Sequence, residues 1–311
     1  MTTKTQTSYR GKLIQKASWI GIVGNAFLAT LKIVVGIVAG SAAVIADGID
    51  SATDILSSLI TYFASRLSEQ PPDKAHPWGH NRIEAIATKI IAIIILFAGL
   101  QLVISTIGIL FSNEVREMPG KAAIAVTLLS IVGKAAIAFY KFRVAKKANS
   151  LMVKADAINM KNDIFLSLAV LLGLGITYLT KLPIIDVCVG IALGLYIIKS
   201  GTELAIETNT ELMDSFSDQD RLYKKLFAIV DDTPGVSNPH RARIRKLNHL
   251  FDISLDVEVD GNISVNEGHD LAMQLEINIK KEFKDVFDVM VHIEPHANKE
   301  KEQFGLCSDD F

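Results

Sequence analysis

The sequence predicts an α-helical membrane protein with six transmembrane helices, followed by a cytoplasmic α+β domain in the order αββαβ. Two observations lead to this prediction. Half of the 311 residues are apolar, and within the first 206 residues they form six long runs. Each run reaches about 20 residues, the length that spans a bilayer as a helix. The residues after 217 instead alternate or follow helical spacing, as in a water-soluble domain.

The six apolar runs follow one another with short polar breaks. They are Trp19–Ala39, Ala42–Ala64, Ile83–Phe111, Lys121–Val144, Leu151–Leu179 and Leu182–Ile206. The first run is too long for a cleavable signal and lacks a small-residue cleavage site, so we expect it to stay in the protein. The breaks predict an N-terminal segment 1–16, a transmembrane domain 17–206, a linker 207–217, a cytoplasmic domain 218–297 and a disordered tail 298–311.

The charges predict the orientation. Residues 1–206 carry 20 Lys and Arg against 12 Asp and Glu, whereas residues 207–311 carry 12 against 22. The basic residues of the first part gather at the N-terminus, between runs two and three, and between runs four and five. By the positive-inside rule we expect both termini in the cytoplasm. No long N-terminal targeting segment is visible, which favours a prokaryotic inner membrane.

Acidic residues lie inside the second and fifth runs, where an isolated charge is costly. Both runs place three polar residues at positions i, i+3 and i+7, on one side of each helix. These residues are Asp47, Asp50 and Asp54 in the second run, and Asp156, Asn159 and Asp163 in the fifth. The shared pattern Ala-Asp-x-Ile is a faint inverted repeat, which is typical of a substrate site near the middle of the membrane.

Four of these residues offer oxygen ligands for a divalent cation, namely Asp50, Asp54, Asn159 and Asp163. Three carboxylates around a 2+ ion leave one excess negative charge, which a proton can remove. Metal and protons would then compete for the same groups, which is the physical basis of an antiporter. The alternative is structural: the acids pair with lysines of the runs, namely Lys32, Lys89, Lys134 or Lys161.

The paired acids and two longer motifs resemble the cation diffusion facilitator family. The motifs are Gly-Ser-Ala-Ala-Val-Ile-Ala-Asp-Gly-Ile-Asp at 40–50 and Asp-Lys-Ala-His-Pro-Trp-Gly-His at 73–80. The resemblance implies a homodimeric divalent-metal/proton antiporter with a ferredoxin-like cytoplasmic domain. By the same resemblance, the transport site is formed by Asp50, Asp54, Asn159 and Asp163.

One departure from the family bears on the metal. Zinc-type members usually have histidine at the position of Asn159. Without that imidazole the site offers only oxygen, which suits Mn(II) better than Zn(II). Family members assigned to manganese similarly lack the histidine. We therefore predict Mn(II) as the transported metal, with Zn(II) or Fe(II) as the alternatives.

The loop between runs two and three holds one acid and two histidines, Asp73, His76 and His80. They form a metal site if the loop folds back, although surface loops often hold such residues without a metal. The resemblance matches these positions to a metal site of the family. It also matches Arg82 to a residue that pairs with an acid at the start of the cytoplasmic domain, here Asp214. An ordinary positive-inside arginine is the alternative.

The cytoplasmic domain is predicted from five segments: a helix at 218–230, strands at 242–247 and 251–260, a helix at 264–283 and a strand at 286–293. The strand 251–260 alternates strictly between polar and apolar residues, which is typical of a half-buried strand. Ser264 and Glu267 form a capping-box pattern at the start of the second helix.

The chemistry of this domain lies in residues that the resemblance matches to metal ligands: His240, Asp256, His269, His292 and Glu294. Asp256 stands where zinc-type members have another histidine, which again favours a harder metal. The alternative is a set of exposed strand-edge histidines on a dimer surface. We predict a regulatory metal site, at which a bound cation draws two acidic domains together.

Other function classes lack their signatures. The sequence has no Gly-x-x-x-x-Gly-Lys-Ser/Thr run and no His-Glu-x-x-His run, so we predict neither a nucleotide cofactor nor an enzyme. Two cysteines exclude a disulfide framework. The expected partners are divalent cations, protons, the lipid bilayer and a second copy of the chain, with no nucleic acid. A channel or a membrane metal receptor that signals through its cytoplasmic domain is the alternative.

Overall fold

The computed structural model of the chain describes residues 3–38, 42–111, 121–180, 184–215, 219–283, 285–297 and 304–310. The chain divides into two compact units, Met1–Asn209 and Thr210–Phe311. We call them the helical unit and the C-terminal unit, and each is described by itself.

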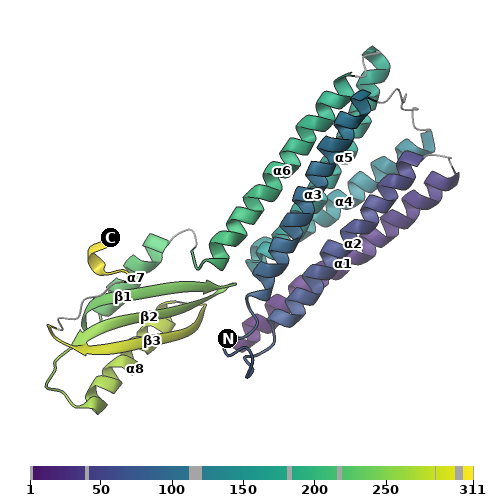
Figure 1. Cartoon of the computed structure of the whole chain (residues 1–311). Helices are drawn as coiled ribbons and strands as arrows, with labels where there is room; N and C mark the ends of the chain where they lie inside the picture. The colour runs from purple at the N-terminus through teal and green to yellow at the C-terminus, as the bar shows by residue number, and fades with distance from the viewer. Residues whose placement is uncertain are drawn as a thin grey trace. The chain divides into compact units, whose positions relative to one another are not determined.

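Six long helices form the helical unit (Figure 1). The shortest has 27 residues and the longest 36, more than the ~20 residues that cross a bilayer. Their bounds are α1 Thr3–Val38, α2 Ala42–Ser68, α3 Ile83–Phe111, α4 Lys121–Ala148, α5 Leu151–Thr180 and α6 Ile184–Leu212. The described residues of each predicted apolar run therefore lie in a helix, and α6 continues to Leu212 through sequence for which we predicted a linker.

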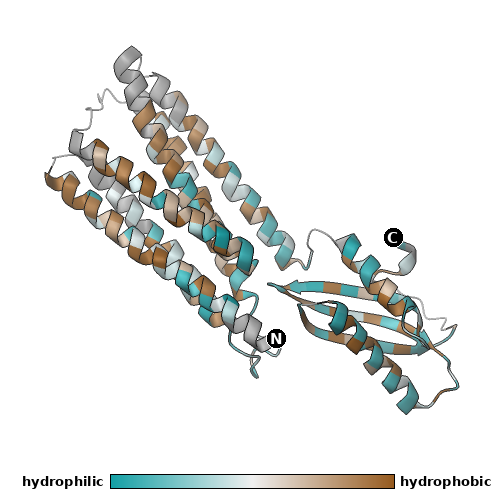
Figure 2. Cartoon of the chain, turned by 180° about the vertical axis from the view of Figure 1, so that it is seen from behind, coloured by the Kyte–Doolittle hydropathy of each residue, from teal (hydrophilic) through white to brown (hydrophobic). Residues whose placement is uncertain are grey.

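Apolar residues cover much of these helices (Figure 2). Within the described ranges, three segments are long and apolar enough to cross a membrane by length and composition: Tyr9–Val38, Ile83–Gly108 and Ile124–Ala148. Large side chains on them are exposed, including Phe27, Phe97 and Val132 at 65–67%. An apolar surface of this extent is expected where lipid is the solvent. The polar residues that lower the hydropathy of α2 and α5 include several that are buried inside the unit.

Two glycines bring α1 close to α4. A Cβ atom at Gly24 would lie 2.4 Å from Cδ1 of Ile137, and one at Gly133 would lie 3.3 Å from Leu28. Small residues allow such a close approach of two membrane helices. The two contacts place residues 24–28 of α1 at the same level as residues 133–137 of α4.

A buried ion pair ties α1 to α3. The guanidinium of Arg10 donates two hydrogen bonds of 2.6 and 2.7 Å to the carboxylate of Glu84. The hydroxyls of Ser68, at the end of α2, and Ser150, before α5, donate to the same carboxylate. Nε of Arg10 donates to the carbonyl of Ala148 at 2.7 Å. This arrangement connects five of the six helices at one end of the unit.

We expect Glu84→Gln to destabilise the helical unit strongly. The change removes the carboxylate that pairs with the buried Arg10, and breaking a buried ion pair costs about 3–5 kcal/mol. The apparent melting temperature of the purified chain in detergent measures the effect. The control is Glu203→Gln, since Glu203 forms only an exposed pair with Lys199 at 3.8 Å and such pairs contribute about 0–1 kcal/mol. Equal melting temperatures for the two variants would contradict the expectation.

The C-terminal unit is a three-stranded sheet with two helices on one face (Figures 1 and 2). Its elements are α7 Gln219–Asp231, β1 Ser237–Leu247, β2 Leu250–Val259, α8 Val265–Glu282 and β3 Val286–Pro295. β1 pairs antiparallel with β2, and β2 pairs parallel with β3. The predicted order αββαβ is confirmed, but β1 begins at Ser237 rather than at 242.

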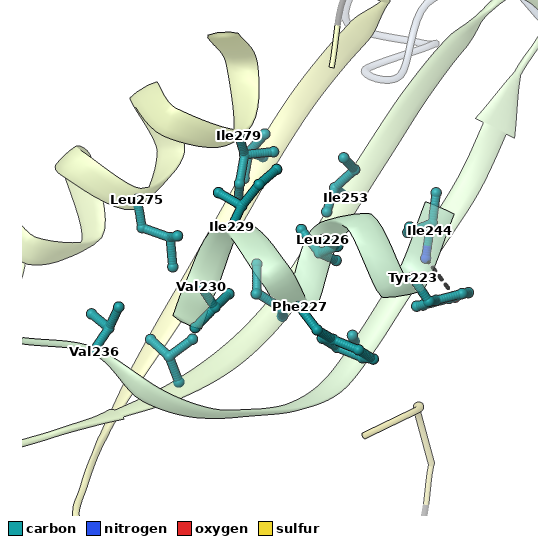
Figure 3. Close-up of a cluster of buried hydrophobic side chains, with 14 of the residues drawn as sticks. Tyr223, Leu226, Phe227, Ile229, Val230, Val236, Ile244, Ile253, Leu275 and Ile279 are labelled. Atoms are coloured by element: carbon teal, nitrogen blue, oxygen red, sulfur yellow. Dashed lines mark hydrogen bonds between the residues drawn. The ribbon is translucent and has the colours of Figure 1, made fainter. Parts of the chain in front are cut away.

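The core of this unit lies between the sheet and the helices (Figure 3). Leu226 of α7, Leu275 of α8 and Ile253 of β2 all belong to this core and are fully buried. The hydroxyl of Tyr223 accepts the backbone N–H of Ile244 at 2.9 Å. Since side chains alternate along a strand, the even-numbered residues of β2 lie on the opposite face of the sheet. We call this the open face.

Two predictions about local structure had different outcomes. The predicted capping box is confirmed, because the Ser264 side chain accepts the N–H of Glu267 and the Glu267 side chain accepts the N–H of Ser264. We predicted disorder for 298–311, but Leu306 exchanges two backbone hydrogen bonds of 3.0 and 3.1 Å with Ala242 of β1. β1 is an edge strand, whose outer backbone groups can pair with another segment, and Leu306 packs against the core. Residues 298–303 and Phe311 lie outside the described ranges.

Candidate metal sites

The two acidic stripes meet where α2 packs against α5. Nδ2 of Asn159 donates a hydrogen bond of 2.9 Å to Oδ1 of Asp54. Asp163 lies one turn further along α5, on the same side of the helix as Asn159. Asp54 and Asn159 are buried, and Asp163 is half-buried. Three of the four residues predicted for transport therefore lie together, and the side chain of Asp50 lies outside the described part of the chain.

The ammonium group of Lys134, from α4, lies between two of these acids. Its Nζ atom is 2.7 Å from Oδ2 of Asp54 and 3.2 Å from Oδ2 of Asp163. Lys134 is only 2% exposed, so water screens these contacts little. The lysine pairing that we considered as the structural alternative thus involves the same two carboxylates that we predicted as metal ligands.

A second buried ion pair lies two turns away on the same helices. Nζ of Lys141 is 2.5 Å from Oδ2 of Asp156 and 2.9 Å from Oγ of Ser58. Lys141 follows Lys134 by seven residues on α4, and Asp156 precedes Asp163 by seven on α5. The two pairs therefore stack along the bundle. Asp156 is thus paired with a lysine, and we do not count it among the predicted ligands.

The loop after α2 folds so that Asp73, His76 and His80 approach one another. Their ligand atoms lie within 4.8 Å of one another, with Asp73 at 3.3 Å from Nδ1 of His76 and 3.6 Å from Nε2 of His80. Backbone N–H groups of His76 and Ala75 donate to Asp73 and lower the pKa of its carboxyl group, so this ligand stays ionised in unusually acidic solution. Nδ1 of His80 is buried and has no hydrogen-bond partner among the residues that the structure describes. The geometry suits the predicted metal site, and metal binding there stays a prediction.

In the C-terminal unit, four of the predicted ligands cluster on the open face of the sheet. The ligand atoms of His240, Asp256 and Glu294 lie within 4.8 Å of one another. The strand register places His240 opposite Asp256, and Nε2 of His240 is 3.2 Å from Oε2 of Glu294 on β3. Nε2 of His292, an exposed side chain, is 3.5 Å from Oε1 of Glu294. One ion can therefore be approached by His240, by the carboxylates of Asp256 and Glu294, and by the exposed side chain of His292.

The remaining predicted site residues are placed differently. His269 is exposed on α8, which packs on the face of the sheet opposite the cluster, so it does not join these ligands within one copy of the chain. Asp256 also accepts a 2.7 Å hydrogen bond from Nη1 of Arg241, which a metal would have to displace. Arg82 and Asp214 belong to different units, and their pairing stays a prediction.

Two family models match the chain, one in each unit. The model described as "Cation efflux transmembrane domain" matches residues 18–213. The model described as "Cation efflux protein, cytoplasmic domain" matches residues 219–296. Together they include α1 from residue 18 onward, α2 to α6, and the whole sheet of the C-terminal unit.

Known proteins match over nearly the full length. Manganese efflux system protein MneP of Bacillus subtilis (strain 168) is 29% identical over 295 residues, which are 93% of this chain and 98% of that protein. Manganese efflux system protein MneS of the same organism is 30% identical over 286 residues, 92% of this chain and 97% of that protein. Cation-efflux pump FieF of Citrobacter koseri is 28% identical over 286 residues, 92% of this chain and 94% of that protein.

Proposed function

Because the chain belongs to the cation efflux, or cation diffusion facilitator, family, we propose that it exports a divalent metal ion in exchange for protons and that Mn(II) is its preferred substrate. Members of this family are multi-pass membrane transporters of divalent cations. The observation that carries the proposal is the meeting of Asp54, Asn159 and Asp163 in the interior of the helical unit. We take these residues, with Asp50, as the transport site.

The chemistry of the ligands favours Mn(II). Carboxylate and amide groups offer only oxygen to the ion here, and manganese accepts oxygen ligands, whereas zinc prefers histidine and cysteine. Asn159 is the residue that keeps imidazole out of the site. Two relatives of similar length carry manganese efflux in their names, which supports the same choice. Zn(II) and Fe(II) are the alternative substrates.

Protons are proposed as the counter-ions because they compete with the metal for the carboxylates. The site loads a metal ion from the cytoplasm as its acids lose protons, and rocking of the helices then exposes it on the other side. Protons displace the metal there and return with the empty site. We place both termini in the cytoplasm, which the basic residues at that end of the helices support.

Transport by the purified chain in proteoliposomes tests this proposal. With an acidic lumen and a metal-sensitive dye inside, external Mn(II) should enter at a rate that rises with the imposed pH gradient, and faster than Zn(II) or Fe(II). Protein-free liposomes correct for leak. Zn(II) uptake at the same rate would remove the preference for manganese. Metal binding without any gradient-dependent flux would favour the metal receptor.

We further propose that the cytoplasmic domain senses the metal. His240, Asp256, His292 and Glu294 lie on its open face, and residues 207–311 carry 22 acids against 12 basic residues. Two such domains in a dimer repel each other, and a bound cation reduces that repulsion. Metal binding would then favour the closed arrangement of the pair and raise the transport rate.

The double variant His240→Ala, His292→Ala is expected to lose this activation, because both histidines lie at the proposed site. The affinity of the transport site should change by no more than about twofold, since distant sites usually act independently. The dependence of the transport rate on the cytoplasmic Mn(II) concentration gives both the activation by metal and the affinity of the transport site. His249→Ala, which alters a histidine of the same domain outside the predicted set, is the control. Unchanged activation in the double variant would refute the sensing role.

A further inference from the structure

A lysine occupies the centre of the proposed transport site. Nζ of Lys134 is in contact with carboxylate oxygens of Asp54 and Asp163 at 2.7 and 3.2 Å. These acids come from two different helices, and Lys134 comes from a third. This ammonium therefore bridges the two acids that are proposed to bind the metal.

The ammonium and a metal ion cannot be bound there together. A metal that is coordinated by both carboxylates would lie roughly 2–2.5 Å from each oxygen, in the space that Nζ takes. A metal ion and an ammonium group that contact the same carboxylates in a buried site repel each other strongly. A metal therefore enters only when the Lys134 side chain withdraws from the acids.

A buried amide at the level of Lys134 offers an acceptor for the withdrawn ammonium. Asn25 of α1 is fully buried, and neither its Nδ2 nor its Oδ1 has a hydrogen-bond partner among the described residues. The contacts at Gly24 and Gly133 place it at the level of Lys134. Buried amides are normally hydrogen-bonded, and Oδ1 of Asn25 is an acceptor that the ammonium of Lys134 can use once it leaves the acids.

We propose that Lys134 is a tethered cation that fills the empty transport site and competes with the metal for Asp54 and Asp163. This inference rests on the proposed function, because it takes those acids as the transport site. The lysine neutralises the buried acids when no metal is bound. Its competition weakens metal binding and thereby helps the ion to leave on the far side.

Metal binding to the full-length chain in detergent tests the proposal, with Mn(II) itself as the probe. The relevant affinity is that of the binding component which Asp54→Asn abolishes, because this component isolates the transport site from the other sites. Lys134→Met removes the charge and keeps most of the side-chain volume. We expect it to bind Mn(II) at least about tenfold more tightly, which corresponds to about 1.4 kcal/mol.

Lys141→Met is the matched control, since it removes a buried lysine from the same side of α4 whose partners are Asp156 and Ser58. Its Mn(II) affinity should stay within about twofold of the native value. Unchanged or weaker binding in Lys134→Met, or equal tightening in both lysine variants, would overturn the proposal. A merely structural lysine would lower the melting temperature without tightening the binding of the metal.

A third variant decides the question if Lys134→Met does not fold. Lys134→Arg keeps the charge and both ion pairs, and a guanidinium holds carboxylates more firmly than an ammonium does. We expect weaker Mn(II) binding in this variant, and unchanged or tighter binding would overturn the proposal. If Asp54→Asn abolishes no binding component at all, the proposed transport site is itself refuted, which is a different result from the failure of Lys134→Met.

Discussion

Asp54→Asn is expected to abolish metal transport, with gradient-driven uptake of Mn(II) in proteoliposomes falling by about 100-fold or more. The variant removes a negative charge from a buried site that must balance a 2+ ion, and a neutral amide is a poor substitute for a carboxylate ligand. The fold should persist, because Lys134 keeps its second partner, Asp163, at 3.2 Å. Loss of transport can therefore be separated from loss of structure by a melting curve.

Asp156→Asn is the matched control for this prediction. Asp156 is also a buried acid that is paired with a lysine, at 2.5 Å, but we do not count it as a ligand. We expect this variant to be less stable, since Lys141 loses its counter-charge, and to keep its affinity for Mn(II). Native transport rates in Asp54→Asn would contradict the proposed site, and equal loss of Mn(II) binding in both variants would indicate a general need for buried charge.

Asn159→His is expected to shift the metal preference from Mn(II) towards Zn(II). An imidazole adds the nitrogen ligand that zinc prefers, while one ring N–H can still donate to Asp54 in place of the amide, which now does so at 2.9 Å. We expect the ratio of Zn(II) to Mn(II) uptake to rise by at least about tenfold, or about 1.4 kcal/mol in relative binding. Competition between the two metals in the same proteoliposomes measures this ratio directly.

Asn162→His provides the comparison for the selectivity experiment. Asn162 is a buried asparagine on the same helix, and its amide has no hydrogen-bond partner within the described residues. An imidazole at this position should leave the metal preference unchanged. If both variants shift it equally, the effect comes from histidine on α5 in general, and Asn159 would lose its role as the selectivity residue.

The helices and the transport acids could be predicted from the sequence because their signals are local. Long apolar runs determine the helices, and three polar residues on one side of a helix reveal a buried polar stripe. Which of the four candidate lysines pairs with the acids could not be predicted, because the pairing depends on which helices pack together. Lys32 lies against Ser51 at 3.1 Å and Lys161 lies over the Tyr196 ring at 5.5 Å, whereas Lys134 reaches the predicted ligands.

The C-terminal unit shows a similar limit. Alternation identified the strand over 251–260 and therefore the face that carries Asp256. The alternation gave no information about His269. This residue lies on a helix that covers the other face of the sheet, away from the remaining ligands. We also did not predict that residues 304–310 are structured. Their contact with the sheet depends on a single apolar residue, Leu306, beside an edge strand. Neither a charged composition nor a short length indicates such a contact.

The most direct test of the central claim, that metal and protons exchange at one buried site, is metal-driven proton movement in the absence of any imposed gradient. Proteoliposomes that contain a pH-sensitive dye would receive external Mn(II), with the native chain and Asp54→Asn compared side by side. The claim predicts that the lumen becomes alkaline as Mn(II) enters with the native chain, and that neither change occurs with Asp54→Asn. Entry of Mn(II) without a change of luminal pH would contradict it.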